Sequence, residues 1–267
     1  MSKLEKVFDT PNKKAFIGFL TAGDPDADST VQFILEMEKA GADLILIETM
    51  SDTYELKAAV LAAKENSTLP IMATVIFDES KKMLTGASPQ VVVSLLEGLG
   101  VDALGINCGL GPKQMKEIVK ELLKYASIPV IVNPNAGLPR SENGKTVFDV
   151  GAEEFAEDME EIVTMGAWFA GGCCGTTPAH IQAMVEKCKE ITPVPIAPKN
   201  YTFVTSYSTA VELGGRPVII GERINPTGKS KFKQALRDHN IDYILEEGVK
   251  QEDSGAHILD VNVGLPE

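Results

Sequence analysis

A regular alternation of strand-like and helix-like segments is the feature that most restricts how this chain can fold. Short apolar runs rich in β-branched residues are each followed by a loop and then by a helical pattern. The runs cover residues 15–20, 44–47, 71–76, 103–106, 130–132 and 167–170. The strands predicted from the later runs end at or just before Thr49, Phe77, Cys108, Asn135 and Cys173, which are 28, 31, 27 and 38 residues apart. Such spacing is typical of βα units that build a parallel sheet.

Local signals support the helices and indicate where the chemistry lies. Pro89, Pro112 and Pro178 each stand at a first helical position. Small and polar residues crowd the ends of the strand-like runs, and in a (βα)8 barrel those ends form the active-site face. We therefore predict an α/β fold of the (βα)8 TIM-barrel type, in which the barrel is incomplete or improvised, with a C-terminal β-α-β fragment of a second barrel. A doubly wound sheet is the alternative, although no glycine-rich dinucleotide loop follows the first run.

The alternation of strand-like and helix-like segments breaks near residue 192, and this break separates the predicted domains. We predict a βα barrel over 1–192, a proline- and hydroxyl-rich linker over 193–215, and a β-α-β fragment over 216–267. Apolar runs at 217–221 and 257–261 predict two strands in this fragment. With the six earlier runs they make eight strands, so they either complete one barrel or begin a second one. The fragment is too short to bury a core by itself.

Composition excludes several classes of function. The chain has 25 Lys and Arg against 38 Asp and Glu, a net charge of -13, so it would repel nucleic acid. Its apolar runs are shorter than the roughly 18 residues that a membrane-spanning helix needs. The first residues lack the apolar segment of a secretory signal. We therefore predict a cytoplasmic protein with neither nucleic-acid nor membrane partners.

Three of the four cysteines are placed where a metal site could form. Cys173 and Cys174 are adjacent, lie between glycines, and precede the helix that begins near Pro178, whose N-terminus favours thiolate. Cys108 ends another strand, so barrel closure would bring three thiols to one rim. Three thiolates with a vacant fourth position describe a catalytic zinc site. Spacing alone leaves a second interpretation, in which the thiols are packed in the core.

The remaining cysteine and the histidines have no such arrangement. Cys188 continues the apolar stripe of its helix, formed by Ile181, Met184 and Val185, so we expect it to pack on the barrel. The three histidines lack a partner at ligand spacing. Structural or surface roles are therefore predicted for His180, His239 and His257.

Four segments, taken in order, resemble the homocysteine-binding barrel of cobalamin-dependent methionine synthases. They cover residues 47–59, 103–108, 134–137 and 171–178. The sequence Gly-Gly-Cys-Cys-Gly-Thr at 171–176, combined with the earlier Asn107-Cys108, is specific to homocysteine and related thiol methyltransferases. The resemblance spans about residues 41 to 190, and it implies a homocysteine S-methyltransferase of the methionine synthase type.

This resemblance implies a role for each matched residue. Cys108, Cys173 and Cys174 would be the zinc ligands and would act in catalysis through zinc. Glu48 would hold the ammonium group of the substrate homocysteine, and Asn135 would lie beside the substrate. The implied methyl donor is methylcobalamin or a corrinoid protein. From the residues alone, Glu48 is equally well a rim carboxylate with a cationic neighbour, and Asn135 a turn former.

Zinc would suit this substrate for a physical reason. A free thiol has a pKa near 8.5 and is mostly protonated at neutral pH. A thiol bound to Zn²⁺ is deprotonated, and a deprotonated sulfur is a nucleophile. The expected cofactor is therefore Zn²⁺, with the methyl group supplied by a methylcorrinoid.

The opening of the chain departs from this family. The family's first strand ends in an Asp-Gly-Ala-x-Gly-Thr type of motif, whereas residues 14–43 here resemble the opening βα unit of the tryptophan synthase α subunit. We therefore predict a chimeric N-terminus over 1–43. Two alternative functions follow: a non-catalytic zinc- or thiol-binding remnant of a methionine synthase, and a tryptophan synthase α-like lyase. The lyase would require Glu48 to act without the second acid of that family.

The tail resembles the first two strands of the methyltetrahydrofolate-binding barrel that follows in the same family. The matching segments are 220–228 and 259–264, which contain Asn225, Asp260 and Asn262. These three residues would have no opposite wall to close on a pterin within residues 1–267. We therefore expect that methyltetrahydrofolate does not bind this chain.

Overall fold

The structure is a computed structural model that describes residues 20–21 and 26–265. The chain divides into two compact units, one of residues up to 199 with 207–209, the other of 200–206 with the residues from 210 onward. The opening strand predicted at 15–20 lies outside the described residues except for its last position. The predicted domain boundaries stay a prediction. Within the described part of the chain, no helix is both long and apolar enough to cross a membrane.

The first unit is built on a sheet of five strands in the order β1-β2-β3-β4-β7. All four neighbouring pairs are parallel. The strands are β1 (Ile45–Met50), β2 (Ile71–Val75), β3 (Ala103–Asn107), β4 (Val130–Asn133) and β7 (Phe169–Ala170). The predicted α/β class with parallel βα units is therefore confirmed. Because β1 and β7 are the two edges of this sheet in the described residues, closure into a barrel stays a prediction.

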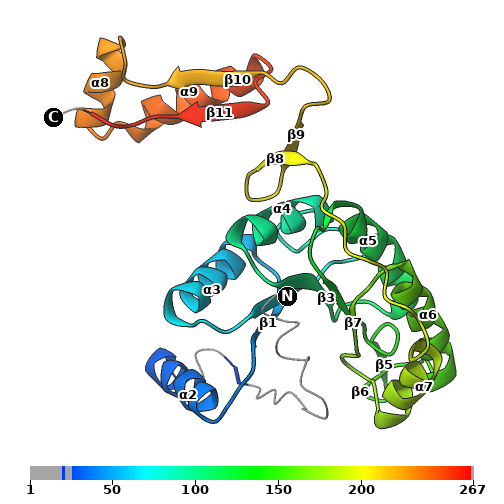
Figure 1. Ribbon diagram of the computed structural model, residues 1–267. Coiled ribbons are helices and arrows are strands. Elements are labelled where there is room, and N and C mark those ends of the chain that lie inside the picture. The colour runs from blue at the N-terminus through cyan, green and yellow to red at the C-terminus, as the bar shows by residue number, and fades with distance from the viewer. Residues whose placement is uncertain (1–19, 22–25, 266–267) are drawn as a thin grey trace. The chain divides into compact units, whose positions relative to one another are not determined.

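Helices follow the strands and cover the outer side of the sheet. Figure 1 shows them as an arc around the strands. They are α3 (Thr53–Asn66), α4 (Pro89–Leu99), α5 (Pro112–Tyr125), α6 (Ala152–Met165) and α7 (Pro178–Cys188). Proline opens α4, α5 and α7, as predicted. The Asp52 carboxylate caps α3 by accepting hydrogen bonds from the backbone N–H groups of Tyr54 and Glu55.

The centre of the sheet forms the core. Every residue of β2 and β3 is buried, as in parallel sheets that are covered on both faces. Gly105 on β3 lies so close to β4 that a β-carbon at this position would overlap the Ile131 carbonyl. The glycine therefore allows the two central strands to approach each other, and this approach brings their carboxyl ends together.

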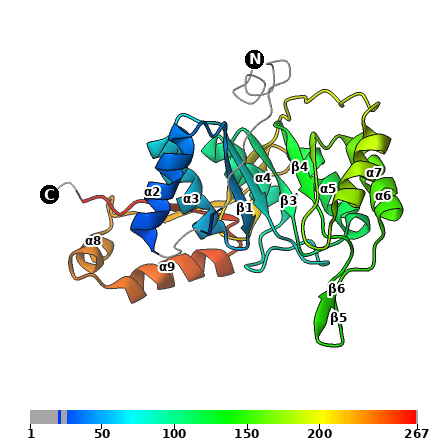
Figure 2. The ribbon, with the colours of Figure 1, turned by 90° about the horizontal axis from the view of Figure 1, so that it is seen from below.

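Two further elements of the first unit lie apart from the sheet. Helix α2 (Ala27–Lys39) begins at Asp26, whose carboxylate accepts a hydrogen bond from the Ser29 backbone N–H. Strands β5 (Arg140–Glu142) and β6 (Lys145–Val147) form an antiparallel hairpin that extends away from the unit (Figure 2). Its turn residues, Asn143 and Gly144, have φ angles of 50° and 74°, as a two-residue hairpin turn requires.

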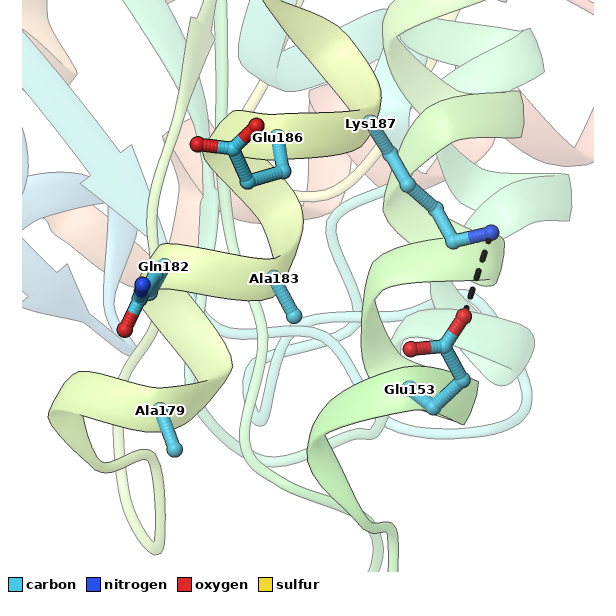
Figure 3. A pocket seen from close by; sticks show the side chains of 6 residues that line it. All are labelled: Glu153, Ala179, Gln182, Ala183, Glu186 and Lys187. Atoms are coloured by element: carbon cyan, nitrogen blue, oxygen red, sulfur yellow. Dashed lines mark ion pairs between the residues drawn. The ribbon is translucent and has the colours of Figure 1, made fainter.

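Helix α7 differs from the prediction in the face that it buries. Met184 is buried and Cys188 is half-buried, but Ile181 and Val185 are exposed. The reason is that α7 packs mainly against α6, so a single row of its side chains is covered. A shallow hollow between the two helices is drawn in Figure 3. The Lys187 ammonium on α7 lies 3.3 Å from the Glu153 carboxylate on α6. The residues that line the hollow are Glu153, Ala179, Gln182, Ala183, Glu186 and Lys187.

The second unit contains two small sheets. Strands β8 (Thr202–Thr205) and β9 (Ala210–Leu213) form an antiparallel hairpin within the segment predicted as a linker. Strands β10 (Ile220–Ile224) and β11 (Ile258–Val261) pair in parallel with each other, and among the described residues they do not join the five-stranded sheet. The helices α8 (Ser230–Arg237) and α9 (Ile241–Asp253) connect them.

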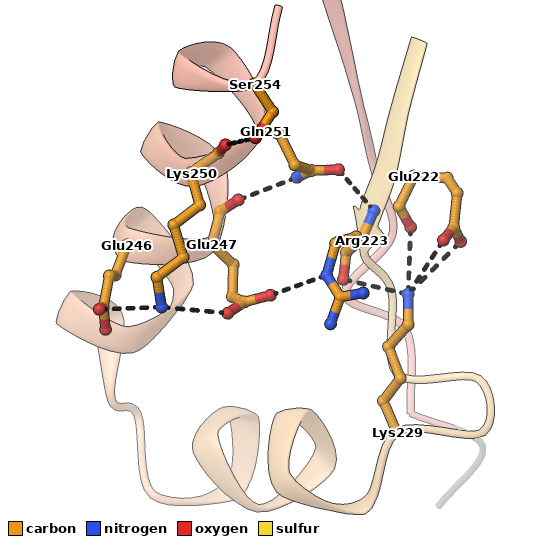
Figure 4. Close-up of polar contacts among 8 residues, drawn as sticks. All are labelled: Glu222, Arg223, Lys229, Glu246, Glu247, Lys250, Gln251 and Ser254. Atoms are coloured by element: carbon orange, nitrogen blue, oxygen red, sulfur yellow. Dashed lines mark hydrogen bonds and ion pairs between the residues drawn. The ribbon is translucent and has the colours of Figure 1, made fainter. Parts of the chain in front are cut away.

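Polar contacts hold the β-α-β part of the second unit together (Figure 4). The Arg223 guanidinium on β10 lies 3.2 Å from the Glu247 carboxylate on α9. The Gln251 side chain accepts a hydrogen bond of 2.8 Å from the Arg223 backbone N–H. Asn225 and Asn262 accept backbone hydrogen bonds within their own turns, from Thr227 and Gly264.

Candidate metal centre

The three cysteines named by the sequence meet at one end of the sheet. Cys108 follows β3, and Cys173 and Cys174 follow β7. The Cys108 and Cys174 sulfur atoms are 3.8 Å apart, and those of Cys173 and Cys174 are 4.0 Å apart. All three sulfur atoms lie within 4.8 Å of one another. Residues 65 positions apart in the chain are neighbours because β3 and β7 both flank β4, and parallel strands end at the same edge.

Backbone hydrogen bonds tie the cysteine loop after β7 to the loop after β4. The Cys173 N–H donates to the Pro134 carbonyl at 2.7 Å, and the Ala136 N–H donates to the Cys174 carbonyl at 2.9 Å. Asn135, which is 2% exposed, accepts a hydrogen bond of 3.0 Å from the Cys174 N–H through its Oδ1 atom. Asn135 therefore fixes the backbone of one of the three cysteines.

Unusual backbone conformations shape the strand ends. Cys108 has a φ angle of 58°, and Thr49, at the end of β1, has one of 61°. Left-handed backbone is uncommon for residues other than glycine, and for a β-branched residue it is a marked outlier. At Cys108 the neighbouring structure imposes it, because the Cys108 N–H donates to the Asn133 carbonyl and the Cys108 carbonyl accepts from Leu110. Strained residues of this kind cluster at functional sites.

The clustered thiols are difficult to ionise without a cation. Burial, together with the neighbouring Cys108 and Cys174, raises the pKa of the Cys173 thiol to about 12. Burial and the contact with Cys108 also raise the pKa of Cys174. The expected help from the helix N-terminus is outweighed, because α7 begins at Pro178 and the helix dipole acts over about one turn. Three thiolates in one place therefore need a positive charge among them.

A tetrahedral zinc ion fits the donor set. Ligands about 2.3 Å from zinc in a tetrahedral site lie about 3.8 Å from one another. The sulfur separations of 3.8 and 4.0 Å match this requirement. Cys174 is exposed, so the cluster is open to solvent on one side. Within the described part of the chain, these three cysteines form the one group of three His, Cys, Asp or Glu side chains close enough to share a metal ion.

His180 supports the site from outside the cluster. Its Nδ1 atom accepts a hydrogen bond of 3.2 Å from the Thr177 N–H, and its Nε2 atom lies 2.9 Å from the Val150 carbonyl. Since a carbonyl accepts, the Nε2 atom carries the proton. Both ring nitrogens are thus occupied in fixing the first turn of α7, which agrees with the structural role predicted for this histidine.

Glu48, whose carboxylate is predicted to bind the substrate, is exposed on β1. Its neighbour Thr49 reaches toward the cysteines, because the Thr49 N–H donates to the Asn107 side chain at 3.0 Å. Asn107 directly precedes Cys108 at the end of β3. Hydrogen bonds between Thr49 and Asn107 therefore join the end of β1 that carries Glu48 to the strand that carries Cys108.

Sequence reasoning did not assign a role to Asn107, and it did not find the link between Asn135 and Cys174. Both are buried polar residues at strand ends, and that is the signal that could have identified them. Tyr207 was also missed. Its hydroxyl donates to the Asp52 carboxylate, and its carbonyl accepts from the Thr53 hydroxyl at 3.1 Å, so it is part of the first unit.

Solved structures show the same type of fold. The homocysteine methyltransferase MmuM from Escherichia coli, in its apo form, superposes with a TM-score of 0.50 and is 24% identical. The match covers 65% of this chain and 61% of that one. This likeness shows that the chain has a βα architecture, with helices outside a parallel sheet and the three thiols at the carboxyl edge of that sheet.

Sequence comparison gives the family. The profile of the homocysteine S-methyltransferase family matches residues 27–188. A methionine synthase from Mycobacterium leprae (strain TN) is 36% identical over 250 residues, which cover 88% of this chain and 21% of that protein. One from Mycobacterium tuberculosis (strain ATCC 25618 / H37Rv) is 34% identical over 244 residues, 88% of this chain and 20% of that protein. The chain belongs to the homocysteine S-methyltransferase family, and it spans about a fifth of the length of these relatives.

Proposed function

We propose that this chain holds one Zn²⁺ through Cys108, Cys173 and Cys174 and uses it to methylate homocysteine on sulfur. The observation that carries the proposal is the meeting of three thiols within 4.8 Å at the carboxyl edge of the sheet. Membership of the homocysteine S-methyltransferase family supports it, because a thiol substrate is suited to a thiol-ligated zinc.

Each residue of the site would have a separate role in the reaction. Zinc, when bound, would lower the pKa of the substrate thiol and so supply a nucleophilic sulfur at neutral pH. The cysteines occupy three positions and leave the exposed side of the cluster for the substrate. The Glu48 carboxylate, exposed at the end of β1, would bind the homocysteine ammonium group. Asn135 would hold the Cys174 loop in place beside the substrate.

We propose methylcobalamin, or a corrinoid protein that carries a methyl group, as the donor. The resemblance of residues 41–190 to cobalamin-dependent methionine synthases supports this choice. Methyl transfer to the substrate sulfur would then give methionine. A cytoplasmic location is proposed with it, since thiol ligands stay reduced in that compartment.

Metal analysis of the purified, reduced chain tests the zinc site. We expect about one zinc per chain after expression with sufficient metal, and a loss of at least half of it in each of the variants Cys108→Ser, Cys173→Ser and Cys174→Ser. Cys188→Ser is the matched control, because Cys188 lies outside the cluster and should leave the zinc content unchanged. Less than half an equivalent in the parent chain, or equal zinc in Cys173→Ser, would remove the proposal.

Calorimetric titration with homocysteine separates an active site from a non-catalytic zinc-binding remnant. The zinc-loaded chain should bind homocysteine, and Glu48→Gln should weaken binding by about tenfold, the low end for a charged hydrogen bond at an exposed position. Glu65→Gln is the control, because Glu65 is exposed near the far end of α3. Zinc binding without homocysteine binding would identify the remnant.

A further inference from the structure

We infer that Asn107 is a positioning residue that joins the end of β1 to the sulfur atom of Cys173 and sets the electron density of that sulfur. This inference rests on the proposed function, because it concerns how the three thiols serve a metal. It assigns a role to a side chain that is not among the proposed zinc ligands or the proposed substrate-binding residues.

The contacts of Asn107 use the whole amide group. The side chain is fully buried at the end of β3. Its Oδ1 atom accepts from the Thr49 N–H at 3.0 Å, and its Nδ2 atom donates to the Thr49 hydroxyl at 2.5 Å. The same Nδ2 atom lies 4.0 Å from the Cys173 sulfur, within reach of a long N–H···S contact. An amide nitrogen has two hydrogens, so it serves both partners at once.

Thr49 explains why this position requires an amide. A β-branched residue at a φ angle of 61° is a marked outlier and persists only when its surroundings determine it. Asn107 binds both the backbone and the side chain of Thr49, and the buried Thr74 hydroxyl gives a second, longer contact of 3.4 Å to the same N–H. A side chain with only a donor or only an acceptor would not make this pair of bonds.

The remaining hydrogen of the amide then has a fixed direction. Because Thr49 holds the amide plane by two bonds, the second N–H is held toward Cys173. A hydrogen bond to a thiolate withdraws electron density from sulfur, and such outer contacts orient and tune metal ligands. The position of the β1 end, next to Glu48, and the donor strength of Cys173 are therefore set by the same side chain.

Cobalt substitution gives a readout that a purely structural role would not change. Replacing zinc by Co²⁺ in the full chain should give a sulfur-to-cobalt charge-transfer band. In Asn107→Leu this band should move to longer wavelength, because loss of the N–H raises the energy of the sulfur electrons. The zinc dissociation constant should rise by about tenfold to a hundredfold. Asn66→Leu is the matched control, since the Asn66 amide donates to the Ala62 carbonyl of its own helix, and its band should not move.

A second background separates the two tasks of Asn107. Glycine at position 49 adopts a positive φ angle without hydrogen bonds from Asn107. The double variant Thr49→Gly, Asn107→Leu should therefore fold even if Asn107→Leu alone does not. The double variant should still show the longer-wavelength band relative to Thr49→Gly. An unchanged band in folded variants overturns the inference, and so does a double variant that fails to fold. If the parent chain itself shows no charge-transfer band, the proposed metal site has failed rather than this inference.

Discussion

Gly175, which directly follows the paired cysteines, provides a sharp test of how the cysteine loop is built. Its φ angle is 80°, and a β-carbon there would lie closer than 3.0 Å to ring atoms of Phe148. Gly144, in the β5–β6 turn, has a φ angle of 74° but open space around it. Alanine at either position incurs the left-handed backbone cost of about 1–2 kcal/mol. Only Gly175→Ala adds overpacking, at about 1–3 kcal/mol.

The two variants can be compared in one denaturation experiment. Both glycines belong to the first unit, and Trp168, the single tryptophan of the chain, lies there too and reports its unfolding by fluorescence. Gly175→Ala should lower the free energy of unfolding by about 2–5 kcal/mol, against about 1–2 kcal/mol for Gly144→Ala. It should also weaken zinc binding, whereas Gly144→Ala should not. Equal losses of stability would refute the packing argument.

Two further predictions concern Asn135 and Tyr207. Asn135→Ala should weaken zinc binding by about tenfold to a hundredfold, because the Cys174 N–H loses its acceptor. The zinc affinity of Asn135→Asp should stay closer to that of the parent chain. A change in homocysteine affinity alone, measured by calorimetry, would contradict the link to Cys174. The Tyr207 hydroxyl lowers the pKa of Asp52 below 3.8, and the Asp52 carboxylate raises the pKa of Tyr207 above 10.0. The contribution of this pair to stability is therefore present between these values and is lost as the pH falls through the pKa of Asp52 or rises through that of Tyr207. The stability of Tyr207→Phe in urea should thus differ from that of the parent chain near pH 7, and the difference should shrink as the pH falls through the lowered pKa of Asp52. A constant difference at every pH would contradict this reasoning.

The fold could be predicted as far as local signals reach. Strands β1, β2, β3, β4 and β7 are short apolar runs bounded by turn residues, and proline marks the starts of α4, α5 and α7, so their order could be predicted from the chain. The polar strands β5 and β6 carry no such signal and were not predicted. The β8–β9 hairpin was not predicted, because its strands lie in a segment that the preceding prolines and the hydroxyl-rich residues 201–208 led us to interpret as a linker. The buried face of α7 was predicted only in part, because it is determined by the tertiary contact between α7 and α6.

The candidate site could be predicted where it depends on topology. Parallel strands end at one edge, so thiols at two strand ends must approach each other, and Cys108, Cys173 and Cys174 do. The supporting side chains could not be predicted in this way. Asn107 and Thr49 are 58 positions apart, and their pairing follows from the sheet register and the left-handed backbone of Thr49, which no local pattern encodes.

X-ray absorption spectroscopy at the zinc edge tests the central claim most directly. The zinc-loaded, reduced chain should show three sulfur ligands at about 2.3 Å, and the number should rise to four when homocysteine is added. Cys188→Ser should give the same result. Fewer than three sulfur ligands in the loaded chain, or a sulfur count that homocysteine does not change, would contradict the proposal that these cysteines hold a zinc ion for a thiol substrate.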